Sequence, residues 1–265
     1  MSGTFLLGVG AQKGGTAWLH RYLADSPQFD GGFRKEYHVW DALDLPSGRL
    51  VRERIEAQGG PRAELLADPE RYFDYFTSLL EPPAVRLTAD ITPAYAELPV
   101  ARLAAVRDGF ATRGVRPAAV FLMRDPVERV WSAARMDMRR LGEAAPEPAE
   151  VRISHMYHHP MYAEKTRYDL TIDALEQVFS PDQVFYGLYE RLFSADTLRP
   201  FCAFAGIDYH EPDPDRRVNE SPKTVELPEE TVRTIARHFA PVYAAVAARF
   251  PDVDLAALWP SARHL

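Results

Sequence analysis

The stretch TFLLGVGAQKGGTAWLHRYLA, residues 4–24, decides the fold class of this chain. Residues 4–9 form an apolar run, which predicts a buried strand of a parallel sheet. A glycine-rich turn over residues 10–16 follows, and apolar residues then recur at helical spacing up to Ala24. A strand, a glycine-rich turn and a helix N-terminus together form an anion site, because the first helical amides have no backbone partner and the helix dipole is positive there.

The rest of the 265 residues repeats this alternation of strand and helix. Further strands are predicted near residues 33–39 and at 85–91, 118–123 and 183–187. Further helices are predicted at residues 68–80, 98–110, 170–179 and 195–205, after Pro126 and after Pro228, the last one broken at Pro241. Long loops are predicted at residues 142–165 and 208–227. This alternation predicts the α/β class, with a single domain over residues 1–265 and a central, mainly parallel sheet flanked by helices.

The composition excludes several classes of protein. The formal net charge is −7 and no long basic run occurs, which argues against a nucleic-acid partner, although a few converging cations can still bind a phosphate. Cys202 is the only cysteine, so no intrachain disulfide can form. The apolar run at residues 5–9 is too short for a signal peptide core or a membrane span. We therefore expect a cytoplasmic protein with no membrane partner.

The glycine-rich turn carries side chains suited to an anionic ligand. Gly14 and Gly15 let the backbone approach the ligand closely, Lys13 supplies a charge, and Thr16 supplies a hydroxyl at the start of the helix. The ATP-binding Walker A loop instead has its lysine after the last glycine, directly followed by a hydroxyl residue for magnesium. Because Lys13 precedes both glycines, the order of residues disfavours a magnesium–ATP kinase. A plain tight turn between strand and helix is the structural alternative.

The segment GAQKGGTAWLHRYL, residues 10–23, resembles the 5′-phosphosulfate loop of sulfotransferases. These enzymes take a sulfuryl group from 3′-phosphoadenosine 5′-phosphosulfate (PAPS). The resemblance implies a P-loop-like sulfotransferase fold, and it implies that six residues bind the donor: Gln12, Lys13, Gly14, Gly15, Thr16 and Ala17. Lys13 would also stabilise the charge that develops on the leaving phosphate.

A second segment, FLMRDPVERVWSAARM at residues 121–136, resembles the part of sulfotransferases that holds the 3′-phosphate of the nucleotide. The resemblance assigns this role to Arg124 and Ser132. Arg124 follows a predicted strand, at the edge where open α/β sheets bind ligands. Ser132 is expected on the polar face of the next helix, outside the core. In sulfotransferases a late basic loop closes over the nucleotide, which suggests Arg217 and Lys223 as further donor contacts.

The segment RKEYHVWD, residues 34–41, resembles the lysine–glutamate–x–histidine segment of glycosaminoglycan-type sulfotransferases. The resemblance implies that Glu36 is the catalytic base and that His38 and Asp41 support the base or contact the acceptor. In an extended segment Glu36 and His38 point to the same side. A carboxylate and an imidazole that converge on one hydroxyl suit general-base catalysis, and either group could be the base.

The segment DITPAY, residues 90–95, resembles the acid–lysine–serine–proline–x–tyrosine segment of the same enzymes. The resemblance implies that Thr92 and Tyr95 contact the acceptor. Ile91 replaces the lysine that helps to hold an anionic sugar in that group, so a glycosaminoglycan acceptor is less favoured.

The predicted loop at residues 142–165 contains further candidates for the acceptor pocket. His155 and Tyr157 could line that pocket. A zinc site would need His158 and His159 in addition, but no cysteine or carboxylate pattern accompanies these histidines, so no metal is predicted.

The sequence therefore predicts in-line transfer of a sulfuryl group from PAPS to a hydroxyl of a small molecule or saccharide, without a metal ion. A small-molecule kinase on a related scaffold and a non-catalytic nucleotide-binding protein are the alternatives. The acceptor and the oligomeric state stay open.

Overall fold

Five strands form a single, wholly parallel sheet in the computed structural model, which describes residues 3–213 and 225–265. The strands are β1 (Thr4–Gly10), β2 (Phe29–Asp30), β3 (Leu87–Ile91), β4 (Arg116–Met123) and β5 (Val184–Leu188). Their order across the sheet is β2-β3-β1-β4-β5. The predicted α/β class is confirmed.

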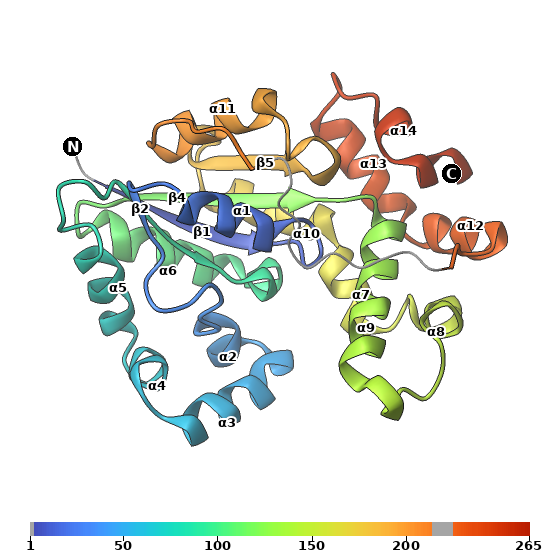
Figure 1. The fold of residues 1–265 in the computed structure, drawn as a ribbon, viewed down its shortest axis with the longest axis horizontal. Helices are drawn as coiled ribbons and strands as arrows, with labels where there is room; N and C mark the ends of the chain where they lie inside the picture. The colour runs from blue at the N-terminus through green and yellow to red at the C-terminus, as the bar shows by residue number, and fades with distance from the viewer. Residues whose placement is uncertain (1–2, 214–224) are drawn as a thin grey trace.

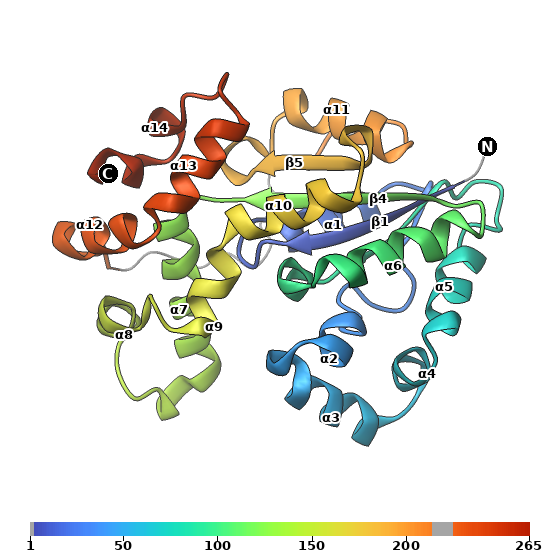
Figure 2. The same cartoon turned by 180° about the vertical axis from the view of Figure 1, so that it is seen from behind.

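Helices cover both faces of this sheet (Figures 1 and 2). Between β1 and β4 along the chain, the helices are α1 (Thr16–Ala24), α2 (Trp40–Asp44), α3 (Arg49–Gln58), α4 (Pro61–Ala67), α5 (Pro69–Ser78) and α6 (Val100–Ala111). After β4 they are α7 (Pro126–Leu141), α8 (Ala149–Met156), α9 (Pro160–Ala163), α10 (Tyr168–Val178), α11 (Ala195–Ala205), α12 (Glu229–His238), α13 (Ala240–Arg249) and α14 (Leu255–Leu258).

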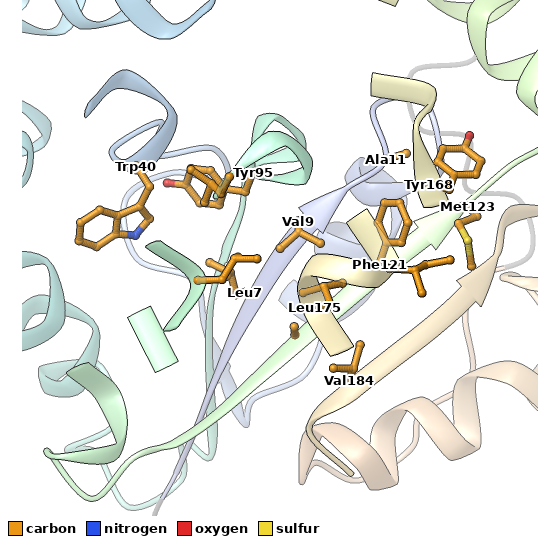
Figure 3. Packing of buried hydrophobic residues seen from close by; sticks show 14 of the residues in the cluster. Leu7, Val9, Ala11, Trp40, Tyr95, Phe121, Met123, Tyr168, Leu175 and Val184 are labelled. Carbon is orange, nitrogen blue, oxygen red and sulfur yellow. The ribbon is translucent and has the colours of Figure 1, made fainter. Parts of the chain in front are cut away.

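The alternation of side chains along β1 divides the core into two layers. Leu6 packs in a cluster with residues of α1 and α11, whereas Leu7 and Val9 pack in a larger cluster with residues of α5, α6 and α10. Figure 3 shows Leu7 and Val9 in this larger cluster, together with Phe121 of β4 and Leu175 of α10. Because successive residues of a strand face opposite sides, one buried strand supports both helical layers.

The position of β1 creates the crevice that open α/β sheets use for ligands. β1 is the central strand. The chain adds β2 and β3 on one side of it and then β4 and β5 on the other side, so the strand order reverses at β1. The carboxyl ends of β1, β3 and β4 meet at one edge, and ligands bind outside that edge where the strand order reverses. The glycine-rich turn follows β1, the segment 92–95 follows β3, and Arg124 follows β4.

The strand predicted near residues 33–39 is wrong. The paired segment β2 is only Phe29–Asp30, and residues 33–39 run as irregular backbone past the end of β3. His38 has a left-handed φ of 56°, which an extended strand does not accept. The amide of Ile91 donates to the carbonyl of Lys35 at 3.2 Å, so the segment stays close to the sheet without pairing along it.

The loop predicted at residues 142–165 is also wrong in part, because α8 and α9 lie within it and bury Ile153 and Tyr162. Three helices between residues 40 and 67 were not predicted. The break at Pro241 is confirmed, since α12 ends at His238 and α13 begins at Ala240. Within the described residues, no helix combines the length and the apolar character that crossing a membrane requires.

Candidate active site

The turn after β1 is a tight loop held against β4. The amide of Ala11 donates to the carbonyl of Leu122 at 2.7 Å, and the amide of Gly14 donates to the carbonyl of Ala11 at 2.9 Å. A Cβ atom at Gly14 would lie 2.5 Å from the oxygen of Leu122, so only glycine fits. Lys13 and Gly15 have left-handed φ values of 69° and 98°. The loop therefore wraps closely against the end of β4, with glycine where a side chain would clash.

The first amides of α1 supply hydrogen-bond donors at this loop. The first intrahelical bond runs from the amide of Leu19 to the carbonyl of Gly15 at 3.0 Å, and no side chain caps the helix. The amides of Thr16 and Ala17 precede that bond and are suited to an anion. Gln12, Lys13, Gly15 and Ala17 are partly exposed, as a binding loop requires.

Positive charge gathers on the loop although the chain is acidic overall. The pKa of Lys13 is lowered to about 8, first by burial and then by the charges of four arginines: Arg139, Arg124, Arg135 and Arg140. One guanidinium nitrogen of Arg124 donates to the carbonyl of Lys13 at 3.5 Å, and its carbon lies 4.4 Å from the ring centroid of Tyr189. These cations favour a ligand with several negative charges at this position.

Ser132 is not on an exposed helix face. Its exposure is 2%, because α7 is covered along most of its length and carries buried residues all round. Arg217 and Lys223 lie outside the described residues.

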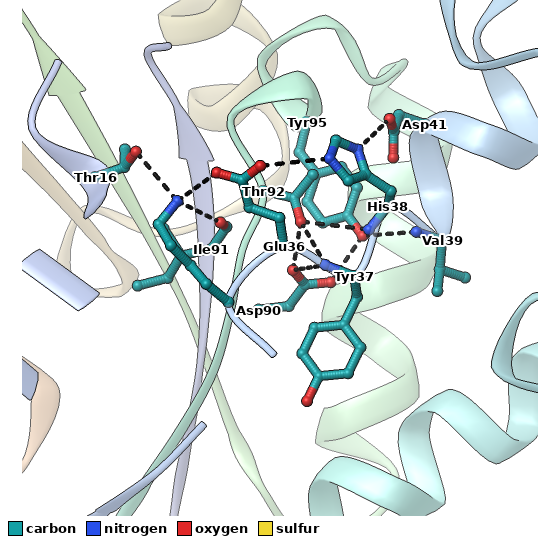
Figure 4. Close-up of polar contacts among 11 residues, drawn as sticks. Thr16, Glu36, Tyr37, His38, Val39, Asp41, Asp90, Ile91, Thr92 and Tyr95 are labelled. Carbon is teal, nitrogen blue, oxygen red and sulfur yellow. Dashed lines mark hydrogen bonds and ion pairs between the residues drawn. The ribbon is translucent and has the colours of Figure 1, made fainter. Parts of the chain in front are cut away.

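Glu36, His38 and Asp41 form one connected group (Figure 4). The Nε2 atom of His38 lies 3.5 Å from Oε2 of Glu36, and its Nδ1 atom lies 2.8 Å from Oδ2 of Asp41. Lys35 joins this group to the phosphate loop, since its Nζ atom contacts Oε1 of Glu36 at 2.6 Å and Oγ1 of Thr16 at 3.5 Å. The imidazole approaches Glu36 through the left-handed turn at His38. The sequence predicted the same approach, but from an extended strand.

The charges of this group distinguish the two candidate bases. Burial alone would raise the pKa of Glu36, but the hydrogen bond with His38 and the charge of Lys35 outweigh it and lower that pKa to about 2. Burial alone would lower the pKa of His38, but Asp41 and Glu36 outweigh it and raise that pKa to about 9. Near neutral pH His38 is therefore an imidazolium that cannot accept a proton. Glu36 is an ionised carboxylate with a side chain that is 41% exposed, so it can accept one.

A buried network beneath the group fixes its backbone. The hydroxyls of Tyr72, Thr92 and Tyr95 donate to the carboxylate of Asp90 at 2.9, 2.6 and 2.7 Å. Thr92 then accepts from the amide of Tyr37 at 3.0 Å. The hydroxyl of Tyr95 also accepts from the amide of Val39 at 3.2 Å.

Thr92 and Tyr95 are buried in this structure. Their exposures are 0% and 1%, and every contact just described points inward, toward Asp90 and the backbone of residues 37–39. In this structure both side chains hold the segment that carries Glu36 and His38.

Asp90 should make the stability of the protein depend on pH. Burial raises the pKa of this carboxyl from 3.8 to about 6, against the lowering effect of its four hydrogen bonds. The folded protein therefore keeps this proton over a range in which the unfolded chain has lost it. The free energy of unfolding should fall as pH rises from about 4 to about 6, by about 1.4 kcal/mol for each unit of the difference. Above that range this contribution is constant.

Denaturant unfolding of the wild type and of Asp90→Asn at several pH values measures this contribution. The variant cannot titrate at this position, so the difference between the two proteins should follow the same slope from about pH 4 to 6. Subtraction removes the other carboxyls, such as Glu97 and Glu190, whose pKa values are also raised by burial. A difference that stays constant over this range would contradict the prediction.

His155 and Tyr157 do not join the group around Glu36. His155 is exposed and pairs with Glu147 at 3.3 Å, and the ring of Tyr157 contacts the rings of His158 and His238. Helix α8, which carries His155 and ends directly before Tyr157, packs on α7 and lies apart from α2 in both overall views. Among residues 3–213 and 225–265, no group of three or more histidine, cysteine or acidic side chains could hold a metal ion.

Sequence reasoning missed Lys35 and Asp90, although each belongs to a segment that it singled out. Lys35 directly precedes Glu36, and Asp90 is the first residue of the segment 90–95. A lysine next to a candidate base, and an acid inside an apolar strand, were the available signals. Neither signal states the partner, which in both cases comes from another part of the chain.

The fold is similar to that of a solved sulfotransferase structure. The sulfotransferase from Alicyclobacillus acidocaldarius matches 94% of this chain and 96% of its own, with 22% sequence identity and a TM-score of 0.67. The sulfotransferase domain of the Synechococcus PCC 7002 olefin synthase matches 91% of this chain and 94% of its own, with 16% identity and a TM-score of 0.48. No family model and no curated protein sequence matches. The similarity to the Alicyclobacillus acidocaldarius structure shows that the chain has the P-loop-like sulfotransferase fold.

Proposed function

We propose that the protein is a PAPS-dependent sulfotransferase that acts on a hydroxyl of a small molecule or saccharide. The observation that carries the proposal is the adjacency of an anion-binding loop and an ionised carboxylate, which one lysine joins. Lys35 contacts Thr16 of the loop at 3.5 Å and Glu36 at 2.6 Å. Because one ammonium reaches both residues, a sulfuryl group held on the loop would lie close to a hydroxyl that binds beside Glu36.

The residues present fit the donor. The close-wrapped backbone at Gly14, the free amides of Thr16 and Ala17 and the ammonium of Lys13 would hold the 5′-phosphosulfate. Arg124 and Ser132 would hold the 3′-phosphate, because Arg124 directly follows β4 at the same edge of the sheet. The arginines that lower the pKa of Lys13 repel its ammonium, and a bound anion of several charges would offset that repulsion.

The proposed chemistry is an in-line displacement at sulfur. The acceptor oxygen forms a bond to sulfur while the bond from sulfur to the phosphate oxygen breaks, and the electron pair of that bond stays on the phosphate. Glu36 takes the proton of the acceptor hydroxyl. Lys13 stabilises the charge on the leaving phosphate, and His38 orients Glu36. The imidazolium is itself held by Asp41 at 2.8 Å. The fixed cations and amides of the loop supply the charge stabilisation that this scheme needs.

Incubation of the purified protein with PAPS and a panel of alcohols, phenols and sugars tests the proposal. We expect adenosine 3′,5′-bisphosphate and a sulfated product to form in equal amounts, and only when both an acceptor and PAPS are present. Parallel reactions contain ATP and magnesium in place of PAPS. Phosphorylated product in those reactions alone would favour the kinase, and PAPS binding without turnover on any acceptor would favour a non-catalytic protein.

A further inference from the structure

Lys35 occupies a position that no role described so far explains. Its ammonium donates to three acceptors on three different segments: Oε1 of Glu36 at 2.6 Å, the carbonyl of Ile91 at 3.2 Å, and Oγ1 of Thr16 at 3.5 Å. Figure 4 shows these acceptors around one point between the start of α1 and the end of β3. The side chain is 19% exposed, so the ammonium is held in place and not free in solvent.

The contact with Lys35 weakens Glu36 as a base. Its two carboxylate oxygens are engaged separately, Oε1 by Lys35 and Oε2 by His38. Together these cations lower the pKa of Glu36 to about 2, despite burial. General-base catalysis is most efficient when the pKa of the base is near the working pH. The arrangement without ligands is therefore poorly suited to removing a proton from a hydroxyl.

Within residues 3–213 and 225–265, Lys35 and His38 are the main cations that lower the pKa of Glu36. His20 of α1 lies close to both Lys35 and Glu36, but burial and then the charge of Lys35 lower its pKa to about 4, so the ring is neutral. Asp90 lies beneath the segment and keeps its hydrogen bonds with tyrosine and threonine hydroxyls. The strength of Glu36 as a base thus depends on its two cationic partners, of which only Lys35 also contacts the donor loop.

The proposed reaction gives Lys35 a second anionic partner. In an in-line transfer the sulfuryl group lies between the phosphate on the loop and the attacking hydroxyl beside Glu36. Lys35 bridges the same two points, from Thr16 to Glu36. The sulfuryl oxygens carry negative charge throughout the transfer, so they compete with Glu36 for the ammonium.

We propose that Lys35 is a catalytic residue shared between the base and the transferred sulfuryl group. Without donor it neutralises Glu36. When PAPS binds, the ammonium turns toward a sulfuryl oxygen, and Glu36 becomes an effective base only in the complex that can react. This role rests on the proposed sulfotransferase activity. It adds no covalent step, since the acceptor proton still goes to Glu36 and the leaving electron pair still stays on the phosphate.

Turnover by Lys35→Met and Lys35→Arg tests the catalytic part of this role. We expect kcat to fall by about 10²–10³-fold in Lys35→Met at saturating PAPS and acceptor, the usual cost of losing one group that stabilises transition-state charge. Lys35→Arg keeps the charge and should recover part of that loss. Arg71→Met is the matched control, because it removes an exposed cation on α5 that pairs with Glu64. Its kcat should equal that of the wild type.

A carbon-13 NMR titration of Glu36 tests the switch and does not depend on turnover. The carboxyl signal is assigned by its loss in Glu36→Gln. In the wild type, PAPS should raise the pKa of Glu36 more than adenosine 3′,5′-bisphosphate does, because the bisphosphate lacks the sulfuryl group. In Lys35→Met the pKa should already be raised in the free protein, and the difference between the two ligands should then be smaller than in the wild type.

Two results would overturn the role of Lys35. One is an unchanged kcat in Lys35→Met beside an active wild type. The other is an equal pKa of Glu36 in the two wild-type complexes. A wild type that forms no sulfated product with any acceptor would instead contradict the proposed function, so the two failures are distinguishable.

Discussion

Replacing Lys13 with alanine is expected to lower kcat for sulfuryl transfer by about 10²–10³-fold, with the fold intact. The ammonium lies on the loop that would carry the leaving phosphate, where charge develops as the bond to sulfur breaks. Arg124 and the helix amides remain, so the donor should still bind, although more weakly. Release of adenosine 3′,5′-bisphosphate under saturating donor and acceptor measures the effect.

Alanine is the suitable replacement because it keeps the Cβ atom. Lys13 has a left-handed φ of 69°, a conformation that glycine would adopt more readily, so Lys13→Gly would change the backbone preference together with the charge. Lys13→Ala leaves that preference nearly unchanged, and its thermal unfolding should match the wild type. A variant that unfolds normally and keeps near-normal kcat would contradict the assignment of Lys13.

The charge of Lys13 also predicts a pH dependence. Burial and the neighbouring arginines lower the pKa of this ammonium to about 8, so the free protein loses the charge as pH rises through about 8. The ratio kcat/KM reports groups of the free protein, and it should therefore fall above that pH. A bound anion favours the ammonium, so the fall in kcat should occur at higher pH. In Lys13→Arg the fall near pH 8 should disappear.

The sequence predicted the strand, turn and helix of the proposed donor side well, because these elements are local in the chain. The strand at residues 4–9, the turn and the following helix are adjacent in the chain, and each follows from short-range rules on apolar runs, glycine and helix ends. The helix start at Asp68 is equally local, with its carboxylate accepting from the amide of Glu70 at 3.0 Å.

On the proposed acceptor side, the sequence predicted that Glu36 and His38 converge, but not the backbone conformation that brings them together. Glu36 and His38 do meet, yet through a left-handed turn at His38 and not through an extended strand. What holds that turn is Asp90 with Thr92 and Tyr95, which come from β3 and its following segment, more than fifty residues later. Propensity and periodicity describe neighbours in sequence and carry no information on such long-range anchoring.

The missed helices have a similar cause. α3 reads RLVRERIEAQ and buries only Ile55 fully, so its sequence offers little apolar periodicity. α8 buries only Ile153, and α9 has four residues. α8 and α9 pack against α7, and α3 packs against α2 and α4. A short polar segment gives no sign of such packing before the fold is known.

Replacing Glu36 with glutamine is expected to lower kcat by about 10²–10⁴-fold, the range that a positioned general base contributes. Glutamine keeps the shape of the side chain and can still accept a hydrogen bond from Lys35, but it cannot take a proton. Affinity for PAPS should be unchanged or higher, because a negative charge next to the sulfuryl site is removed. Steady-state kinetics and calorimetric titration with PAPS measure the two quantities.

Glu56→Gln is the matched control, since Glu56 lies exposed on α3 and pairs with Arg52 at 2.9 Å. Its activity should equal that of the wild type. In Glu36→Gln the imidazole keeps its contact with Asp41 at 2.8 Å, so it should remain protonated near neutral pH and should not replace the lost base. Substantial activity in this variant would therefore contradict Glu36 as the base. If Glu36→Gln stays active, a loss of that activity in the double variant Glu36→Gln, His38→Asn would identify His38 as the base. The imidazole, neutral once it is freed from Glu36, would then accept the proton.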